Sequence, residues 1–155
     1  EARKLKARPK FAGGYVSRMT TVLLAKFGLD ATAYIVAQTM RCLAVQYIHE
    51  LKHDQAIEGT DVHSVAGLFA GILRACRQDF EYERVSATHS RIVLKSYKPF
   101  DWEVPNNLRD ALFEFQRMGA RILNGRLRVS RSFTPSYGPI EAETWDFEDA
   151  GHWLW

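Results

Sequence analysis

Hydrophobic positions in the first part of the chain recur at helical spacing. Residues 15–27 are predicted to form a first helix that ends at Gly28, because glycine readily adopts the left-handed conformation found at helix ends. Asp30 is a suitable N-cap for a second helix that runs to about His53. The short link between the two helices predicts an antiparallel pair. The second helix carries its apolar face at Ala33, Val36, Met40, Leu43, Ala44, Tyr47 and Leu51.

A third helix is expected from Thr60 or Asp61 to about Arg77, where apolar residues again follow the helical period. Gly67 and Gly71 lie one turn apart within it. Because glycine has no side chain, this pair predicts the close approach of another backbone to the helix.

From Phe80 the period of the pattern changes to two, which is typical of strands. The strand that begins at Phe80 is expected to form a hairpin with residues 91–97. A register that pairs Val85 with Arg91 places Glu81 opposite Lys95 on the polar face. It also places Tyr82 opposite Leu94 on the apolar face.

A fourth helix follows Pro105, from about residue 107 to residue 123, and two further strands follow it. These strands are expected at residues 126–133 and 140–147, with a turn at 134–139 between them. Pairing Ser132 with Glu141 would bring Arg128 opposite Trp145, in position for a cation–π contact. The helix presents Leu108, Ala111, Leu112, Phe115 and Ile122 to the core.

The order of elements predicts an α+β fold. An N-terminal helical hairpin and a third helix precede a four-stranded antiparallel sheet, built as hairpin, helix, hairpin, with helices on one face. At 155 residues the chain is long enough for one hydrophobic core, and no repeat or linker divides it. We therefore expect a basic flexible arm at residues 1–14 and a single domain at residues 15–155.

Charge is unevenly distributed along the chain. The first ten residues carry five basic side chains and one acidic one, and the other 145 carry 16 basic and 17 acidic side chains, a net charge of −1. A nucleic-acid partner is therefore not expected, since such domains have a basic face within the fold. The arm suits a phosphate or an acidic lipid surface, although a solvated tail is the commoner outcome for a short charged terminus.

Uninterrupted apolar runs are short, so no membrane partner is expected. The two cysteines, Cys42 and Cys76, cannot form a disulfide framework, and the chain has no CxxC pair. A cytoplasmic location is the resulting expectation.

His49-Glu50-Leu51-Lys52-His53 matches the HExxH pattern of zinc hydrolases. Two histidines one turn apart on a helix can bind the same zinc ion, and the glutamate between them can act as general base. His63, or else Glu58, would have to supply the third ligand. The two histidines point away from the apolar face, and Lys52 places a cation inside the motif. A zinc hydrolase is accordingly an alternative interpretation.

Other nucleophiles have less support. Ser64, His89 and Asp79 lack the nucleophile elbow that accompanies a catalytic triad. Cys42 and Cys76 fall within or near predicted helices, where half-buried cysteines usually serve packing.

Aromatic residues concentrate in and beside the predicted sheet. Such residues can fill a hydrophobic core. Alternatively, they can line a pocket between the sheet and the helices, where arginines would orient the carboxylate or carbonyl group of a ligand. The two C-terminal tryptophans, Trp153 and Trp155, are expected to dock on this chain or on a partner subunit. The candidate pocket residues are Tyr82, Arg84, Tyr97, Arg128 and Trp145.

Residues 60–150 resemble the small α+β family that joins 4-vinyl-reductase-type domains and L-2-amino-thiazoline-4-carboxylate hydrolase-like proteins. The similar features are Ser96-Tyr97-Lys98-Pro99-Phe100, the helix that follows, and Glu143-Thr144-Trp145-Asp146-Phe147. The resemblance implies a small-molecule pocket between sheet and helices, often in a dimer. This chain lacks the cysteines that the family tends to carry in these two motifs, so thiol or metal chemistry is not implied.

Three functions follow as expectations. The leading one is a homodimeric domain that binds a small aromatic or carboxylated metabolite, either as an enzyme such as a hydrolase or as a sensor. The second is the zinc hydrolase. The third is a non-catalytic subunit that docks through the basic arm and the tryptophan-rich tail.

Overall fold

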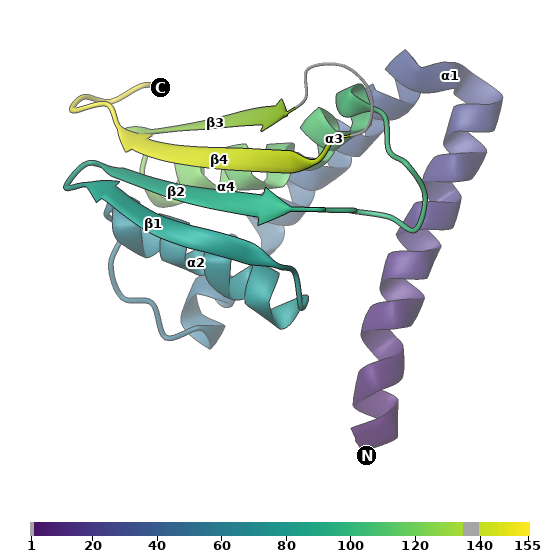
Figure 1. Ribbon diagram of the computed structural model, residues 1–155, viewed down its shortest axis with the longest axis horizontal. Coiled ribbons are helices and arrows are strands. Elements are labelled where there is room, and N and C mark those ends of the chain that lie inside the picture. Colours follow the sequence, from purple (N-terminus) through teal and green to yellow (C-terminus); the bar gives the residue numbers. More distant parts are fainter. Residues whose placement is uncertain (1, 135–139) are drawn as a thin grey trace.

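The computed structural model describes residues 2–134 and 140–155, with side chains from Gly14 onward, and confirms the α+β fold (Figure 1). Residues 135–139 of the predicted turn, and the basic side chains of the first ten residues, lie outside the described part. The elements are α1 (Ala2–Asp54), α2 (Val62–Ala75), β1 (Phe80–Ser86), β2 (His89–Lys95), α3 (Asn106–Leu112), α4 (Glu114–Leu123), β3 (Leu127–Thr134) and β4 (Ala142–Asp149).

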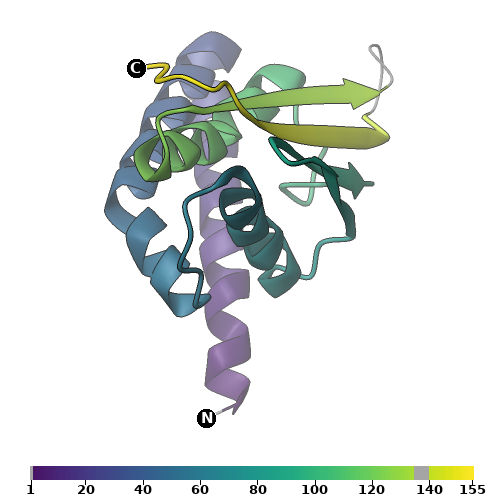
Figure 2. The same cartoon turned by 90° about the vertical axis from the view of Figure 1, so that its left-hand side faces the viewer.

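Helix α1 consists of two segments that meet at Gly28. This residue has φ 81° and ψ 178°, a conformation that is almost exclusive to glycine. Figures 1 and 2 show the chain turning back here, so the two segments run in opposite directions, as the predicted helical hairpin does. The helix resumes at once, and Thr32 Oγ1 donates a hydrogen bond to the Gly28 carbonyl at 2.7 Å. Asp30 therefore lies inside the second segment and does not cap it.

The backbone of residues 2–14, expected as a flexible arm, is the beginning of the first segment. Farther along, Ser17 fixes this segment to the loop before α3. Its hydroxyl donates to Asp101 Oδ1 at 3.1 Å and accepts from Trp102 Nε1 at 2.9 Å. The second segment buries Ala44 and Ile48 completely, and it packs against α3 and α4.

Among the described residues, Gly14–Asp54 is the one helix long and apolar enough to cross a bilayer by length and composition alone. Its most apolar 18-residue stretch has a mean hydropathy of 1.3, and 17% of that stretch is buried in the protein. Polar residues interrupt this stretch, so the chain has no long uninterrupted apolar run in its sequence.

The sheet has the strand order β1-β2-β4-β3 and is antiparallel throughout. Helices cover one face of it (Figures 1 and 2). Inward-facing Ile92, Leu94, Trp145 and Phe147 are almost fully buried against these helices. The opposite face carries alternating polar residues, as expected for a sheet with one solvated side.

The first hairpin pairs two residues away from the predicted register. Tyr82 lies opposite Ile92, and the strands are joined by a tight turn at Ala87 and Thr88. A shift by two preserves the face of every side chain, so Tyr82 still points inward. Glu81 and Lys95 remain close enough to form an ion pair on the outer face.

The second hairpin pairs three residues away from the predicted register. Arg131 lies opposite Trp145, whereas Arg128 lies opposite Glu148. An odd shift changes the face of one strand relative to the other, so the expected contact between Arg128 and Trp145 is wrong. The observed register buries Leu127 and the inward face of β3 together with Trp145.

Helix α2 begins as predicted, with Asp61 as its N-cap. The Asp61 carboxylate accepts hydrogen bonds from the backbone N–H groups of His63 and Ser64, at 3.0 and 3.1 Å. The prediction that another backbone approaches α2 closely at Gly67 and Gly71 is wrong. A Cβ at Gly67 would meet no atom within 4 Å, and the space beside Gly71 is filled by the side chain of Gln55.

The predicted fourth helix is divided into α3 and α4 at Phe113, which retains a helical conformation with φ −68° and ψ −12°. Beyond the sheet, the C-terminal tail docks on this chain, one of the two expected outcomes. The Leu154 N–H donates to the Gly125 carbonyl at 2.9 Å, and the Arg121 guanidinium lies 3.8 Å from the ring centroid of Trp155. Trp153 and Trp155 nevertheless remain 66% and 58% exposed.

Candidate ligand pocket

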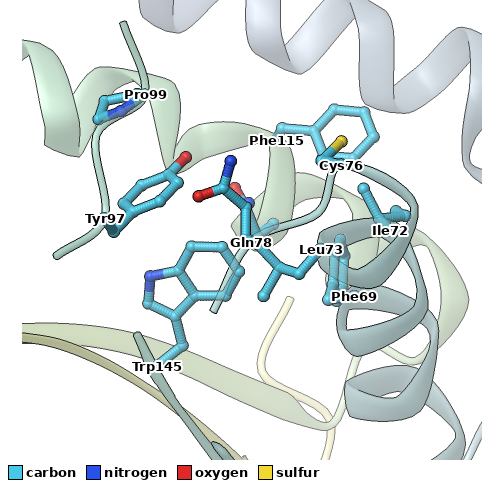
Figure 3. A pocket seen from close by; sticks show the side chains of 10 residues that line it. Phe69, Ile72, Leu73, Cys76, Gln78, Tyr97, Pro99, Phe115 and Trp145 are labelled. Atoms are coloured by element: carbon cyan, nitrogen blue, oxygen red, sulfur yellow. The ribbon is translucent and has the colours of Figure 1, made fainter. Parts of the chain in front are cut away.

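A pocket of about 200 Å³ lies between α2, α4 and the inner face of the sheet (Figure 3). Helix α2 and the turn after it supply one side, the loop after β2 supplies the other, and Trp145 of β4 completes it. The lining residues are Phe69, Ile72, Leu73, Cys76, Gln78, Tyr97, Pro99, Phe115, Gln116 and Trp145.

Two aromatic pairs line the pocket. Phe69 and Phe115 meet edge to face, with ring centroids 6.2 Å apart and an interplanar angle of 88°. On the opposite side, Tyr97 and Trp145 adopt a similar arrangement (Figure 3). Such pairs hold each other at defined angles, so they give the pocket fixed, flat surfaces.

The pocket also contains polar groups in a largely apolar setting. Gln116 Oε1 is buried and has no hydrogen-bond partner within the described part of the protein. Leaving such a group unsatisfied costs about 1–3 kcal/mol. Gln78 and the Tyr97 hydroxyl also reach into the pocket (Figure 3). A bound molecule that donates a hydrogen bond to Gln116 would remove this cost.

The Tyr97 phenol is protonated at neutral pH. Burial raises its pKa, and the nearby Glu143 carboxylate raises it further, because both disfavour the phenolate. The hydroxyl therefore remains both a donor and an acceptor of hydrogen bonds toward the pocket.

Behind the aromatic wall lies a buried network of charged side chains. Glu143 forms an ion pair with Arg131 and accepts a hydrogen bond from Trp145 Nε1 at 3.3 Å, which fixes the indole. Arg109 donates to the Tyr97 carbonyl at 2.9 Å. A void of about 20 Å³ beside Arg109 and Glu143 shares Tyr97, Gln116 and Trp145 with the main pocket.

These arginines are already paired with acidic groups. Glu143 lies against Arg131, and Glu103 lies 3.6 Å from Arg109. The surroundings of the pocket are therefore close to electrically neutral. This arrangement favours an uncharged ligand over a carboxylate.

Of the five predicted pocket residues, the structure brings Tyr97 and Trp145 together. Arg84 is exposed near the end of β1, and Arg128 is exposed on the outer face of the sheet. Tyr82 lies elsewhere on the inner face, where its hydroxyl approaches Ser90 Oγ at 3.3 Å.

Sequence reasoning missed the helical side of the pocket. Phe69, Phe115 and Gln116 come from two helices whose meeting point no local pattern reveals. One usable signal was a polar Gln116 directly after a core-facing phenylalanine in a helix. Cys42 and Cys76 were expected to be half-buried packing residues, but both are exposed, and Cys76 lines the pocket.

The HExxH histidines lie on the solvent-facing side of α1, as the helical wheel predicted. His49, Glu50 and His53 are all exposed. His63 lies in α2, where its Nδ1 is 2.6 Å from Ser90 Oγ. Across residues 2–134 and 140–155, no group of three His, Cys, Asp or Glu side chains is arranged to hold a metal ion. These described residues thus supply no third ligand for the zinc site that the motif predicts.

The contact between Ser90 and His63 has the distance of a nucleophile and its base, but Ser90 is completely buried. A substrate carbonyl cannot reach its hydroxyl, so the contact serves packing. Ser64 and His89, which lack a nucleophile elbow, also have structural partners. Ser64 Oγ donates to Asp61 at 2.6 Å, and His89 Nε2 lies 2.6 Å from Asp146.

No family model and no curated protein matches this chain.

Proposed function

We propose that this protein binds a small, uncharged aromatic molecule in the pocket between α2, α4 and the sheet. The observation that carries the proposal is the buried, unpaired Gln116 Oε1 in an aromatic-walled cavity. Flat walls suit a flat ligand, and the free carbonyl oxygen suits a ligand with one O–H or N–H donor. The resemblance of residues 60–150 to the 4-vinyl-reductase-type family implies a pocket in the same region.

The volume limits the size of this ligand. An apolar protein cavity of about 150 Å³ accommodates benzene. A pocket of about 200 Å³ therefore suits one ring with a few substituents. Most drug-sized molecules need pockets of about 300 Å³ or more, so a single-ring ligand fits this pocket better than a multi-ring one.

The charged network narrows the ligand class proposed from the sequence. A carboxylated metabolite would need an arginine free to pair with it, and Arg84 and Arg128 lie away from the pocket. Arg109 and Arg131 are neutralised by their own acidic partners. The sequence predicted an aromatic or a carboxylated metabolite, and we accordingly favour the aromatic one. A cytoplasmic location and a homodimer remain predictions from the sequence.

Calorimetric titration with phenol and with toluene tests the proposal, because the two have similar shapes and only phenol donates a hydrogen bond. Both should bind the wild-type protein. In Gln116→Leu the advantage of phenol over toluene should shrink by about tenfold, since one buried hydrogen bond contributes about 1 kcal/mol or somewhat more. The absence of binding by both probes, or an unchanged ratio in Gln116→Leu, would overturn the proposal.

A pair of cysteine variants locates the binding. Cys76→Phe places a ring at the edge of the pocket and should abolish binding of both probes. Cys42→Phe makes the same change at an exposed cysteine of α1 that does not line the pocket, and it should bind like wild type. If both variants bind equally well, the ligand occupies another place.

A further inference from the structure

The first segment of α1 carries an exposed apolar face that we call the outer α1 face. It consists of Val16, Met19, Val22 and Phe27, which are 39%, 45%, 53% and 61% exposed. At 100° per residue these four positions fall within one side of the helix. The opposite side, which includes Ser17, is turned toward the protein.

This apolar face belongs to a segment that carries only positive charge. Residues 2–29 contain seven lysines and arginines and no aspartate or glutamate. The other 127 residues hold 14 basic and 18 acidic side chains, a net charge of −4. Arg18 and Lys26 lie within the part of the segment whose side chains are described, and both are exposed.

We propose that the outer α1 face binds the surface of an anionic lipid bilayer, with the first segment of α1 lying in the plane of the headgroups. A cationic helix with a broad apolar face is the arrangement that partitions into such an interface. Its apolar side chains enter the headgroup boundary, and its lysines and arginines attract acidic lipids. The charge of the segment thus complements this partner.

The geometry is that of a helix on a membrane and not across it. Five of the first ten residues are lysine or arginine, so the apolar part of the segment is residues 11–27. As a helix this part extends about 25 Å, less than the hydrocarbon thickness of about 30 Å, and it contains Arg18 and Lys26. At Gly28 the chain turns back and the second segment packs on α3 and α4. The inward side of the first segment is also held by Ser17, which bonds to Asp101 and Trp102.

A second copy of this chain is the less favoured occupant. Joining two outer α1 faces would bring two segments without acidic residues together, and their positive charges would repel. This repulsion is absent at an acidic lipid surface.

Vesicle flotation tests the proposal with the full chain. Vesicles of phosphatidylcholine alone and of phosphatidylcholine with phosphatidylglycerol are compared at low and high salt. We expect binding to the mixed vesicles that weakens as salt rises, because ions screen attraction to lipid headgroups. Met19→Glu and Val22→Glu should each weaken partitioning by about tenfold, the effect of losing one buried apolar side chain.

Val85→Glu is the matched control. Val85 is an exposed valine, 41% accessible, at the far end of β1, so this variant has the same change of charge outside the outer α1 face. It should bind the mixed vesicles like wild type, and all three variants should keep the wild-type circular dichroism.

Three results would overturn the proposal. The first is that the protein does not float with the mixed vesicles. The second is that Val85→Glu loses as much binding as Met19→Glu. The third is that neutral and acidic vesicles bind the protein equally well. If light scattering instead shows a dimer that only Met19→Glu and Val22→Glu dissociate, and no vesicle binding is seen, the occupant is a second copy and the lipid proposal is wrong. None of these measurements depends on the aromatic pocket.

Discussion

The ring of Tyr97 meets the ring of Trp145 edge to face, with centroids 6.1 Å apart and an angle of 86° between the planes. One residue lies just after β2 and the other near the middle of β4, so the contact joins the loop to the sheet. Both rings face the pocket, and Glu143 holds the indole from behind. The wall is therefore fixed before any ligand arrives.

The first prediction concerns the pH dependence of stability. Because burial raises the pKa of Tyr97 in the folded state, the unfolded chain releases this proton first as the pH rises past about 10. The contribution of Tyr97 is fully present below that pH and is lost above it. Urea unfolding of wild type should therefore weaken more steeply with alkaline pH than unfolding of Tyr97→Phe. Parallel curves for the two proteins would contradict this expectation.

The second prediction compares two glycines in helices. A Cβ at Gly119 would lie 2.8 Å from Ile48 Cδ1 and 3.2 Å from Phe69 Cζ, so Gly119→Ala should destabilise the protein by about 1–3 kcal/mol. Gly67→Ala adds the same methyl group where nothing lies within 4 Å, and it should stabilise by up to about 1 kcal/mol. Chemical denaturation measures both, and equal effects at the two sites would refute the packing explanation.

The third prediction concerns the reversal of α1. Gly28→Ala forces a side chain into a conformation that glycine alone adopts readily, at a cost of about 1–3 kcal/mol. The reversal should loosen, and hydrogen exchange in the helix around Ser17 should become faster. Gly14→Ala is the control, because a Cβ there meets no atom within 4 Å and the position lies inside the helix. If exchange around Ser17 is as slow in Gly28→Ala as in the control, the reversal does not depend on glycine.

The fourth prediction concerns zinc. His49 and His53 are exposed and have no third ligand in the described part of the chain, so removal of metal with a chelator should leave the melting temperature unchanged. His53→Ala should melt like wild type. A melting temperature that falls with the chelator, recovers with zinc and is insensitive to both in His53→Ala would restore the metal site.

The sequence predicted the elements well because each depends on local chemistry. Asp61 caps α2 through its own near neighbours, and the alternation that begins at Phe80 is visible within one strand. Pairings between residues that lie far apart in the chain were predicted less well. In the observed register Arg131, and not Arg128, lies opposite Trp145. This register buries one whole face of β3. The prediction considered only single pairs of side chains and did not take the burial of that face into account.

Only the sheet side of the candidate pocket could be predicted, again because local patterns do not show which distant residues meet. Tyr97 and Trp145 were accessible to sequence reasoning because Tyr97 follows β2 and Trp145 lies within β4, and both strands have a clear inward face. The opposite wall, which includes Phe69 and Phe115, exists only where α2 and α4 converge on the sheet. No spacing within either helix reveals that convergence.

The strand order has a consequence for how the chain matures. Strand β4 lies between β2 and β3 and pairs with both, yet it follows the other three strands of the sheet in the chain. Its contact of Trp145 with Ile92 closes a loop of more than fifty residues, which is slow compared with forming a hairpin. Until Asp149 has left the ribosome, β2 and β3 each present an unpaired edge. During synthesis the edge of β2 therefore stays unpaired from Lys95 until β4 follows, and the edge of β3 stays unpaired for the shorter interval after Thr134. Such exposed edges can pair with other chains, so this is the interval in which a chaperone would protect the protein most.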